Sequence, residues 1–385
     1  MFKTELINHF KTIKTPFYYY DLDLLDRTLD QIKKHGLSKG HYVHYAIKAN
    51  FNFKILEKIR KAGLGIDCVS GGEIERAIES GFNPEQIAFA GVGKTDAEIE
   101  LGLDHDIYSF NCESIQELTV LNDIASQKGR VARVAIRINP NVEAKTHKYI
   151  TTGLNENKFG ITTDKLPVLF ERLPQLKSVR LNGIHFHIGS QITDLKPYDQ
   201  LCEKVNDLQN IFEQKGYELP HLNLGGGYGI DYEDPDKNSI PDFKAFFGVF
   251  DRKLEIRQGQ QIHFELGRSI VGQCGSLVSR VLFIKEGFTT QFAVIDAGMT
   301  ELIRPALYQA SHRIDVLNSE KPLKTYDVVG PICESSDTFR RGIELPELER
   351  GDLVAIRSAG AYGEVMGSGF NLRERVKALY SDEFS

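Results

Sequence analysis

Short apolar runs alternate with longer amphipathic segments through most of this 385-residue chain. The apolar runs cover residues 42–47, 65–69, 87–90, 107–110, 131–138, 181–188, 222–224 and 262–266. Helical patterns lie between them, for example at 52–62, 72–80, 114–128 and 196–215. Buried parallel strands read as continuous apolar runs and need a helical crossover to return. These units therefore predict an α/β fold, a (β/α)8 TIM-like barrel, with an open doubly wound sheet as the alternative.

The pattern changes after about residue 270. Strand-like runs separated by turns follow at 276–285, 292–297, 327–329 and 352–358, with little helical periodicity. They predict a separate C-terminal all-β domain. The run PFYYYD at 16–21 does not fit the barrel order, so we assign it as an N-terminal strand donated to the β domain. The predicted domains are 22–260 for the barrel and 1–21 plus 261–385 for the β domain.

Charge and cysteine usage exclude several classes. The net charge of -6 comes without long charged runs, which argues against nucleic-acid and membrane-surface partners. No apolar stretch approaches the ~20 residues of a membrane helix, and the first residues lack a signal-peptide core, so we expect a cytoplasmic protein. The five cysteines are scattered and form no CxxC pair, which indicates reduced thiols rather than disulfides or a zinc site.

Chemically interesting residues follow the predicted barrel strands, where active sites of this fold lie. The first strand ends in YAIKAN at 45–50, so Lys48 closes an apolar run. A low-dielectric surrounding lowers the pKa of a lysine and frees its amine as a nucleophile. For Lys48 taken alone, a strand-end lysine reaching solvent is the plainer interpretation.

Two further strand ends carry histidines and glycines. In HFHIGS at 185–190, His185 and His187 share one face, and no acid or cysteine at zinc-like spacing accompanies them. We therefore predict no metal site there, but an imidazole that stacks on a cofactor ring or a buried core pair. In LGGGYG at 224–229, consecutive glycines expose backbone N–H groups as phosphate binding requires, and a tight turn is the alternative.

The last barrel strand ends in FELGR at 264–268. A carboxylate leaving an apolar run, here Glu265, needs a cationic partner. The protonated ring nitrogen of pyridoxal phosphate is one candidate and Arg268 is the other. The β domain adds three patches, RPALY at 304–308, PICESSD at 331–337 and SAGAYG at 358–363.

Together these motifs resemble the alanine-racemase-like (fold-type III) pyridoxal-phosphate-dependent decarboxylases nearly end to end. Further matches are GGE at 71–73, NKFG at 157–160 and GAYG at 360–363. The resemblance implies that Lys48 forms the Schiff base with pyridoxal 5'-phosphate, that His187 stacks on the ring and that Glu265 pairs with the ring nitrogen. It also implies cofactor contacts from Asp67, Ser190, Gly226, Gly227, Gly267, Arg268 and Tyr362.

Within that family, the chain looks most similar to the members that decarboxylate meso-2,6-diaminopimelate to L-lysine and CO2. The resemblance implies that Cys333 donates a proton and that Glu334 holds the distal amine. Both would be supplied across a homodimer interface. The residues implied to hold the distal amino-acid end of the substrate are Arg268, Arg304, Tyr308 and Tyr362.

The sequence departs from the family pattern at two places and leaves three alternative functions. Leu266 stands where the family usually has proline, and TFRR at 338–341 differs from the common pattern. A related decarboxylase of ornithine, lysine, arginine or carboxynorspermidine is the nearest alternative, although Arg304 and Tyr308 favour a distal carboxylate. A non-catalytic regulatory relative should have lost Lys48 or Cys333, and the β domain argues against a racemase.

Overall fold

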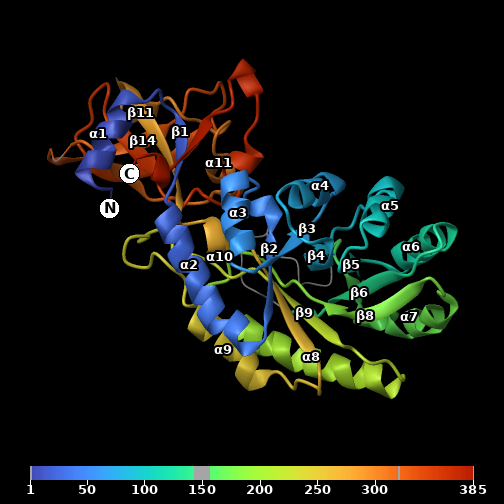
Figure 1. Ribbon diagram of the computed structural model, residues 1–385. Coiled ribbons are helices and arrows are strands. Elements are labelled where there is room, and N and C mark those ends of the chain that lie inside the picture. Colours follow the sequence, from blue (N-terminus) through green and yellow to red (C-terminus); the bar gives the residue numbers. More distant parts are fainter. Residues whose placement is uncertain (1, 143–156, 320, 385) are drawn as a thin grey trace. The chain divides into compact units, whose positions relative to one another are not determined.

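The computed structural model describes residues 2–142, 157–319 and 321–384 (Figure 1). The chain forms two compact units. The unit that we call the barrel unit comprises Leu29–Gly229 and Asp242–Gly267. The other, which we call the β unit, comprises Met1–Thr28, Ile230–Pro241 and Arg268–Ser385.

Eight parallel strands close into a barrel in the barrel unit (Figure 1). Their order is β2-β3-β4-β5-β6-β8-β9-β10, and β10 pairs again with β2. They span Tyr42–Ala46 (β2), Gly65–Cys68 (β3), Ile87–Phe89 (β4), Ser109–Cys112 (β5), Ala132–Asn139 (β6), Val179–His185 (β8), His221–Gly226 (β9) and Gln261–Leu266 (β10). A two-residue strand, β7 (Ile161–Thr162), pairs in parallel with the end of β6. The predicted barrel is confirmed, with strand ends shifted by a few residues, and the open sheet is wrong.

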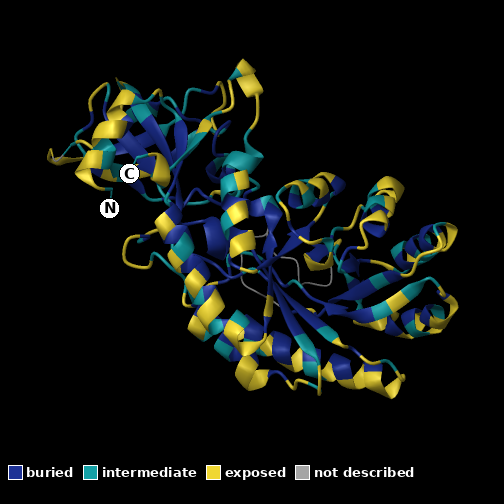
Figure 2. Ribbon diagram, viewed as in Figure 1, coloured by how far each residue is buried: buried dark blue, intermediate teal, exposed yellow. Residues whose placement is uncertain are grey.

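Helices cover the barrel and turn their buried sides toward it (Figure 2). In α3 (Phe53–Lys61) the buried residues are Ile55, Leu56 and Ile59, at helical spacing, while its basic residues face out. The others are α2 (Leu22–His35), α4 (Gly71–Glu79), α5 (Asp96–Asp104), α6 (Ile115–Gln127), α7 (Leu166–Arg172), α8 (Lys196–Gln214) and α9 (Phe243–Lys253). In the described part of the chain, no helix is both long and apolar enough to cross a bilayer.

The β unit is built on one mixed sheet in the order β13-β16-β11-β12-β14-β15. The strands span Gly275–Glu286 (β11), Gln291–Ile295 (β12), Ile314–Val316 (β13), Leu323–Val329 (β14), Thr338–Pro346 (β15) and Leu353–Ile356 (β16). Two short helices, α10 (Arg268–Val271) and α11 (Arg304–Tyr308), belong to the same unit. The separate β domain is therefore confirmed, although β13, β15 and α11 were not predicted.

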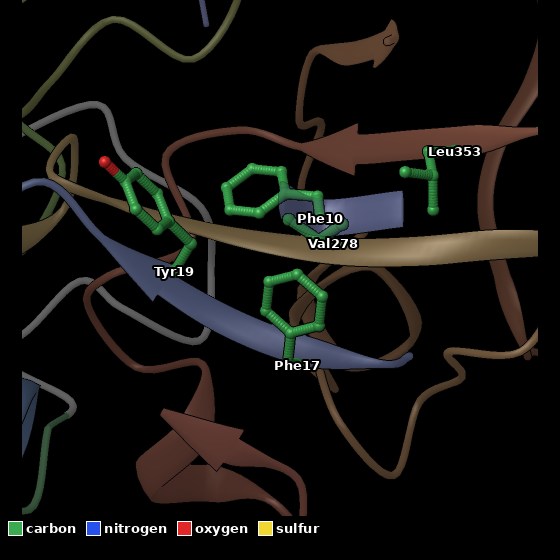
Figure 3. Close-up of a cluster of buried hydrophobic side chains, with 5 residues drawn as sticks. All are labelled: Phe10, Phe17, Tyr19, Val278 and Leu353. Atoms are coloured by element: carbon green, nitrogen blue, oxygen red, sulfur yellow. The ribbon is translucent and has the colours of Figure 1, made fainter. Parts of the chain in front are cut away.

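The N-terminal strand belongs to this sheet, as predicted. β1 (Phe17–Tyr20) pairs antiparallel with β11 and parallel with β17 (Lys377–Tyr380). One face of β1 packs on α1 (Thr4–Thr12), where Phe10 lies 5.3 Å from the ring of Phe17 and 5.1 Å from that of Tyr19 (Figure 3). Val278 and Leu353 complete this cluster (Figure 3). Burial of Phe17 and Tyr19, which share one face of β1, therefore holds the N-terminal segment against the β unit.

Candidate active site

Lys48 and Asp67 form an ion pair at the carboxyl ends of adjacent barrel strands. Lys48 lies in a 3-10 turn (Ile47–Ala49) directly after β2, and Asp67 lies on β3. The Lys48 Nζ is 3.1 Å from the Asp67 Oδ2, and the carboxyl group is buried. Burial, followed by nearby Glu265, raises the pKa of Asp67 to about 7, although Lys48 opposes this shift. The predicted lysine therefore faces the barrel interior rather than solvent alone.

Glu265, on β10, is held by three donors. The Asn111 and Asn223 side-chain amides donate to its Oε1 at 3.0 and 2.7 Å. His185 Nε2 lies 3.0 Å from Oε2. Burial alone would raise the pKa of Glu265, but His185 and Lys48 hold it below its usual range. The carboxylate is therefore ionised, and because each oxygen can accept more than one hydrogen bond, it retains acceptor capacity.

The segments that follow β8 and β9 run side by side. Phe186 N donates to Asn223 O at 2.8 Å, and Ile192 N donates to Gly227 O at 2.9 Å. A Cβ on Gly227, whose φ is +86°, would lie 2.1 Å from Gly189 O. The structure thus brings the segments of His187, Ser190 and Gly227 together.

The glycines also allow close strand packing. A Cβ on Gly226 would lie 1.7 Å from Glu265 O, so only glycine permits this approach of β9 to β10. The close packing of these glycines agrees with the turn interpretation, and the phosphate interpretation stays a prediction. Burial, and then Arg137 and Lys48, lower the pKa of His187 to about 3, which leaves its imidazole neutral.

A buried ion pair that sequence reasoning missed borders this region. Arg137 Nη1 donates to Glu113 Oε1 at 2.6 Å, and Gly160 N donates to Glu113 Oε2 at 2.8 Å. Arg137 also lies 4.7 Å from the ring centroid of Phe159. The NKFG motif at 157–160 is therefore fixed to β6 through Glu113. The sequence did not indicate this ion pair, because Arg137 lies within an apolar strand rather than at its end.

In the β unit, Tyr232 lies between two buried arginines. Arg268 Nη1 donates to the Tyr232 hydroxyl at 2.5 Å, and Arg268 also lies 4.9 Å from the ring centroid of Tyr362. The Arg304 guanidinium lies 4.7 Å from the ring of Tyr232. Tyr308 ends α11 one helical turn after Arg304, on the same side of the helix. Of the predicted substrate residues, Arg268 and Arg304 therefore both contact Tyr232, which was not predicted, and Tyr362 contacts Arg268.

Cys333 and Glu334 lie exposed in a turn that Asp337 organises. The buried Asp337 carboxylate accepts the backbone N–H groups of Ile332 at 2.7 Å and Met299 at 2.6 Å. Asp337 N donates back to Glu334 O at 3.0 Å. All five cysteines are free thiols, and Cys333 alone is exposed. A thiol on a fixed, accessible turn can donate a proton to a bound molecule.

The barrel residues fit pyridoxal phosphate. An amine nucleophile (Lys48), an ionised buried carboxylate (Glu265) and a neutral imidazole (His187) lie at the carboxyl ends of the strands. Among the described residues, Asp67 Oδ1 is buried without a hydrogen-bond partner. Such an acceptor is costly unless a ligand completes it.

Comparison with known proteins identifies the class. The family described as pyridoxal-dependent decarboxylase, pyridoxal binding domain, matches residues 23–272. The chain is therefore a pyridoxal-dependent decarboxylase by family, and pyridoxal phosphate is its cofactor.

More specific relatives cover nearly the whole chain. It is 53% identical over 98% of both chains to a diaminopimelate decarboxylase of Bacteroides thetaiotaomicron. It is 41% identical to one of Helicobacter pylori, over 96% of this chain and 91% of that one. A crystal structure of diaminopimelate decarboxylase from Helicobacter pylori complexed with L-lysine superposes with a TM-score of 0.92 at 39% identity, covering 98% and 94% of the two chains. The chain belongs to the diaminopimelate decarboxylase family.

Proposed function

We propose that this protein decarboxylates meso-2,6-diaminopimelate to L-lysine and CO2, with pyridoxal 5'-phosphate attached to Lys48. The observation that carries the choice of substrate is the environment of Arg304. This guanidinium is buried, and no carboxylate of a described residue lies within ion-pair distance of it. A buried cation requires an anion, and a substrate with a distal carboxylate supplies one. Ornithine, lysine and arginine have an amine or guanidine at that end.

The barrel residues divide the work on the cofactor. When bound, pyridoxal phosphate withdraws the electron pair that departing CO2 leaves on the substrate carbon. Glu265 offers an ionised partner to a protonated ring nitrogen, and the donors on Asn111, Asn223 and His185 keep it ionised. Neutral His187 can lie flat against a ring without adding charge. Asp67 holds the amine of Lys48 near the strand ends.

We assign the phosphate to backbone and side chains of the strand ends. The proposed contacts come from Ser190, Gly226, Gly227, Gly267, Arg268 and Tyr362. Gly226 and Gly227 support this assignment, because neither carries a side chain that would cover the N–H groups of the run. Arg268 and Tyr362 already contact each other in the β unit.

We further propose that two copies share active sites, with Cys333 and Glu334 acting in the partner's site. The exposure of this turn supports the proposal. Cys333 would donate the proton to the substrate carbon, and Glu334 would hold the distal amine. We also propose a domain division in which residues 22–260 form the cofactor-binding barrel, and residues 1–21 plus 261–385 form the β domain that contributes substrate and dimer-interface residues. The five free thiols agree with a cytoplasmic protein.

The decisive experiment measures CO2 release by the cofactor-loaded protein. Meso-diaminopimelate is compared with ornithine, lysine, arginine and carboxynorspermidine. We expect release from diaminopimelate, with L-lysine as the product. Release only from one of the other substrates would retain the chemistry and overturn the assignment of Arg304. No release from any of them, despite cofactor absorbance, would favour the non-catalytic alternative.

Shared sites are tested by mixing two inactive variants, Lys48→Ala and Cys333→Ala, under conditions that exchange subunits. A mixed dimer would contain one intact site and one doubly altered site. Random exchange should therefore restore roughly a quarter of the wild-type activity. Recovery of no activity, with subunit exchange verified, would contradict sharing.

A further inference from the structure

Among the described residues, the side chain of Arg304 has one hydrogen-bond partner, the imidazole of His312. Arg304 Nη1 lies 2.7 Å from His312 Nε2, and both side chains are buried. Among the described residues, no hydrogen-bond acceptor meets the buried Arg304 Nε. On a guanidinium, the Nε and Nη2 hydrogens point along one edge, and Nη1 lies away from that edge. The contact with His312 therefore uses Nη1 and leaves the edge formed by Nε and Nη2 without an acceptor among the described residues.

The chemistry of the pair fixes the protonation of His312. A guanidinium can only donate, so His312 Nε2 must be the acceptor and carry no proton. The proton then resides on Nδ1, which donates to Arg357 O at 2.8 Å. Burial, and next the charge of Arg304, lower the pKa of His312 to about 3. The imidazole is therefore neutral, with a single tautomer imposed by its two contacts.

We propose that His312 is a positioning residue that turns the Nε and Nη2 edge of Arg304 toward the distal carboxylate of the substrate. A planar guanidinium binds a carboxylate through two parallel hydrogen bonds only when its edge is correctly oriented. A protonated or apolar side chain at position 312 would not hold Nη1. This inference rests on the proposed function, in which Arg304 binds that carboxylate, and it adds the residue that sets selectivity.

Arg340 connects the chain segments of Tyr232 and His312, the two side chains that contact Arg304. Arg340 Nη1 lies 3.1 Å from Glu233 Oε2, next to Tyr232, and it also donates to the hydroxyl of Ser311, next to His312. The rings of Tyr232 and His312 meet edge to face at 4.9 Å. Arg340 therefore joins the two segments that hold Arg304. This role explains one residue of the 338–341 segment that departs from the family pattern.

The test compares two variants of equal length, His312→Gln and His312→Met. The oxygen of glutamine can still accept from Arg304, whereas methionine offers no comparable acceptor. Binding to the cofactor-loaded protein is measured for L-lysine and for 1,5-diaminopentane, which lacks the carboxylate. We expect His312→Met to weaken L-lysine binding about tenfold, to leave 1,5-diaminopentane binding unchanged, and His312→Gln to restore most of the loss. Thermal unfolding checks that both variants fold.

A double variant separates positioning from a general structural role. In an Arg304→Leu background, His312→Met should cause no further loss of L-lysine binding, because its effect passes through Arg304. The inference is overturned if both ligands weaken equally, or if the two losses add. In turnover, His312→Met should raise the KM for diaminopimelate more than it lowers kcat.

Failure of the proposed function would look different. If the wild-type protein released no CO2 from diaminopimelate, the assignment of the reaction would fail. L-lysine binding requires no turnover, so the comparison of His312→Met with His312→Gln would still decide whether His312 positions Arg304.

Discussion

His185 Nε2 lies 3.0 Å from Glu265 Oε2, deep inside the barrel. Because an ionised carboxylate only accepts, the proton of this hydrogen bond belongs to His185. The opposite ring atom, Nδ1, is buried without a hydrogen-bond partner among the described residues. His185 therefore uses its Nε2 proton to bind Glu265. Of the two histidines in the HFHIGS motif, we expect His187 to contact the cofactor.

Glu265→Gln should lower kcat by roughly 10²-fold or more, because the amide cannot stabilise a protonated ring nitrogen. Covalent cofactor attachment should survive, since Lys48 is unchanged. The measurement pairs kcat with the absorbance of the bound cofactor. Asn111→Ala, which removes one of the donors to Glu265, should give a smaller loss. A Glu265→Gln variant within a few-fold of wild type would contradict the assigned role.

Lys48→Ala should abolish both turnover and covalent attachment of the cofactor. Borohydride reduction followed by mass spectrometry of the intact chain detects the attached group. Lys61→Ala is the matched control, because Lys61 is exposed on α3 and pairs with Glu57. Decarboxylation by the Lys48→Ala protein would remove the basis of the mechanism.

The barrel was predictable because its strands are buried on both faces. Such strands read as continuous apolar runs, and each run was found with its end shifted by a few residues. In contrast, β15 mixes buried, intermediate and exposed residues in an irregular pattern, and β13 has three residues. Neither pattern is long or regular enough to indicate a strand.

A polar residue at the end of an apolar run was the sequence signal for the candidate site. It pointed to Lys48 and Glu265, and the resemblance supplied the roles that we propose for them. Asn111 and Asn223 were missed because each is one amide inside a strand, which sequence alone does not relate to Glu265. Their importance comes from three-dimensional convergence on one oxygen atom. Tyr232 was missed because it is distant in sequence from Arg268, and His312 because a histidine eight residues after Arg304 follows no spacing that indicates contact.

Asp337→Asn should lower kcat about tenfold and leave the cofactor absorbance unchanged. The carboxylate accepts two backbone N–H groups, one from the residue before Cys333, and an amide can replace only part of this. Displacing the turn by a fraction of an ångström would misplace Cys333, the proposed proton donor. Ser336→Ala, in the same exposed turn, is the control. Equal losses in both variants would assign the effect to the turn in general rather than to Asp337.

A histidine cluster at the amino ends of the barrel strands should make the protein less stable in acid. His263 Nδ1 lies 3.0 Å from His44 Nε2, and His263 Nε2 lies 3.0 Å from both His221 Nδ1 and the Tyr108 hydroxyl. His44 Nδ1 lies 3.2 Å from Gln86 O, which can only accept. Neutral His44 therefore accepts from His263, which in turn accepts from His221 and Tyr108.

This chain of hydrogen bonds requires His44 and His263 to be neutral, because each of them accepts through Nε2. Burial, followed by His44 and Arg180, lowers the pKa of His221 to about 4, and burial also lowers the pKa values of His44 and His263. An unfolded histidine titrates near 6.5. As the pH falls from about 6.5 toward 4, the unfolded chain binds protons that the folded chain does not, so the free energy of unfolding decreases.

For partly exposed His221 this loss should be about 1 kcal/mol between pH 7.5 and pH 5, after discounting for solvent screening. Urea unfolding at the two pH values measures it. His221→Asn keeps an N–H donor near the Nδ1 position but does not titrate, so the difference in stability between the two pH values should shrink. The control is His105→Asn, because His105 is exposed and lies outside the cluster. An unchanged pH dependence in His221→Asn would place the acid sensitivity elsewhere in the chain.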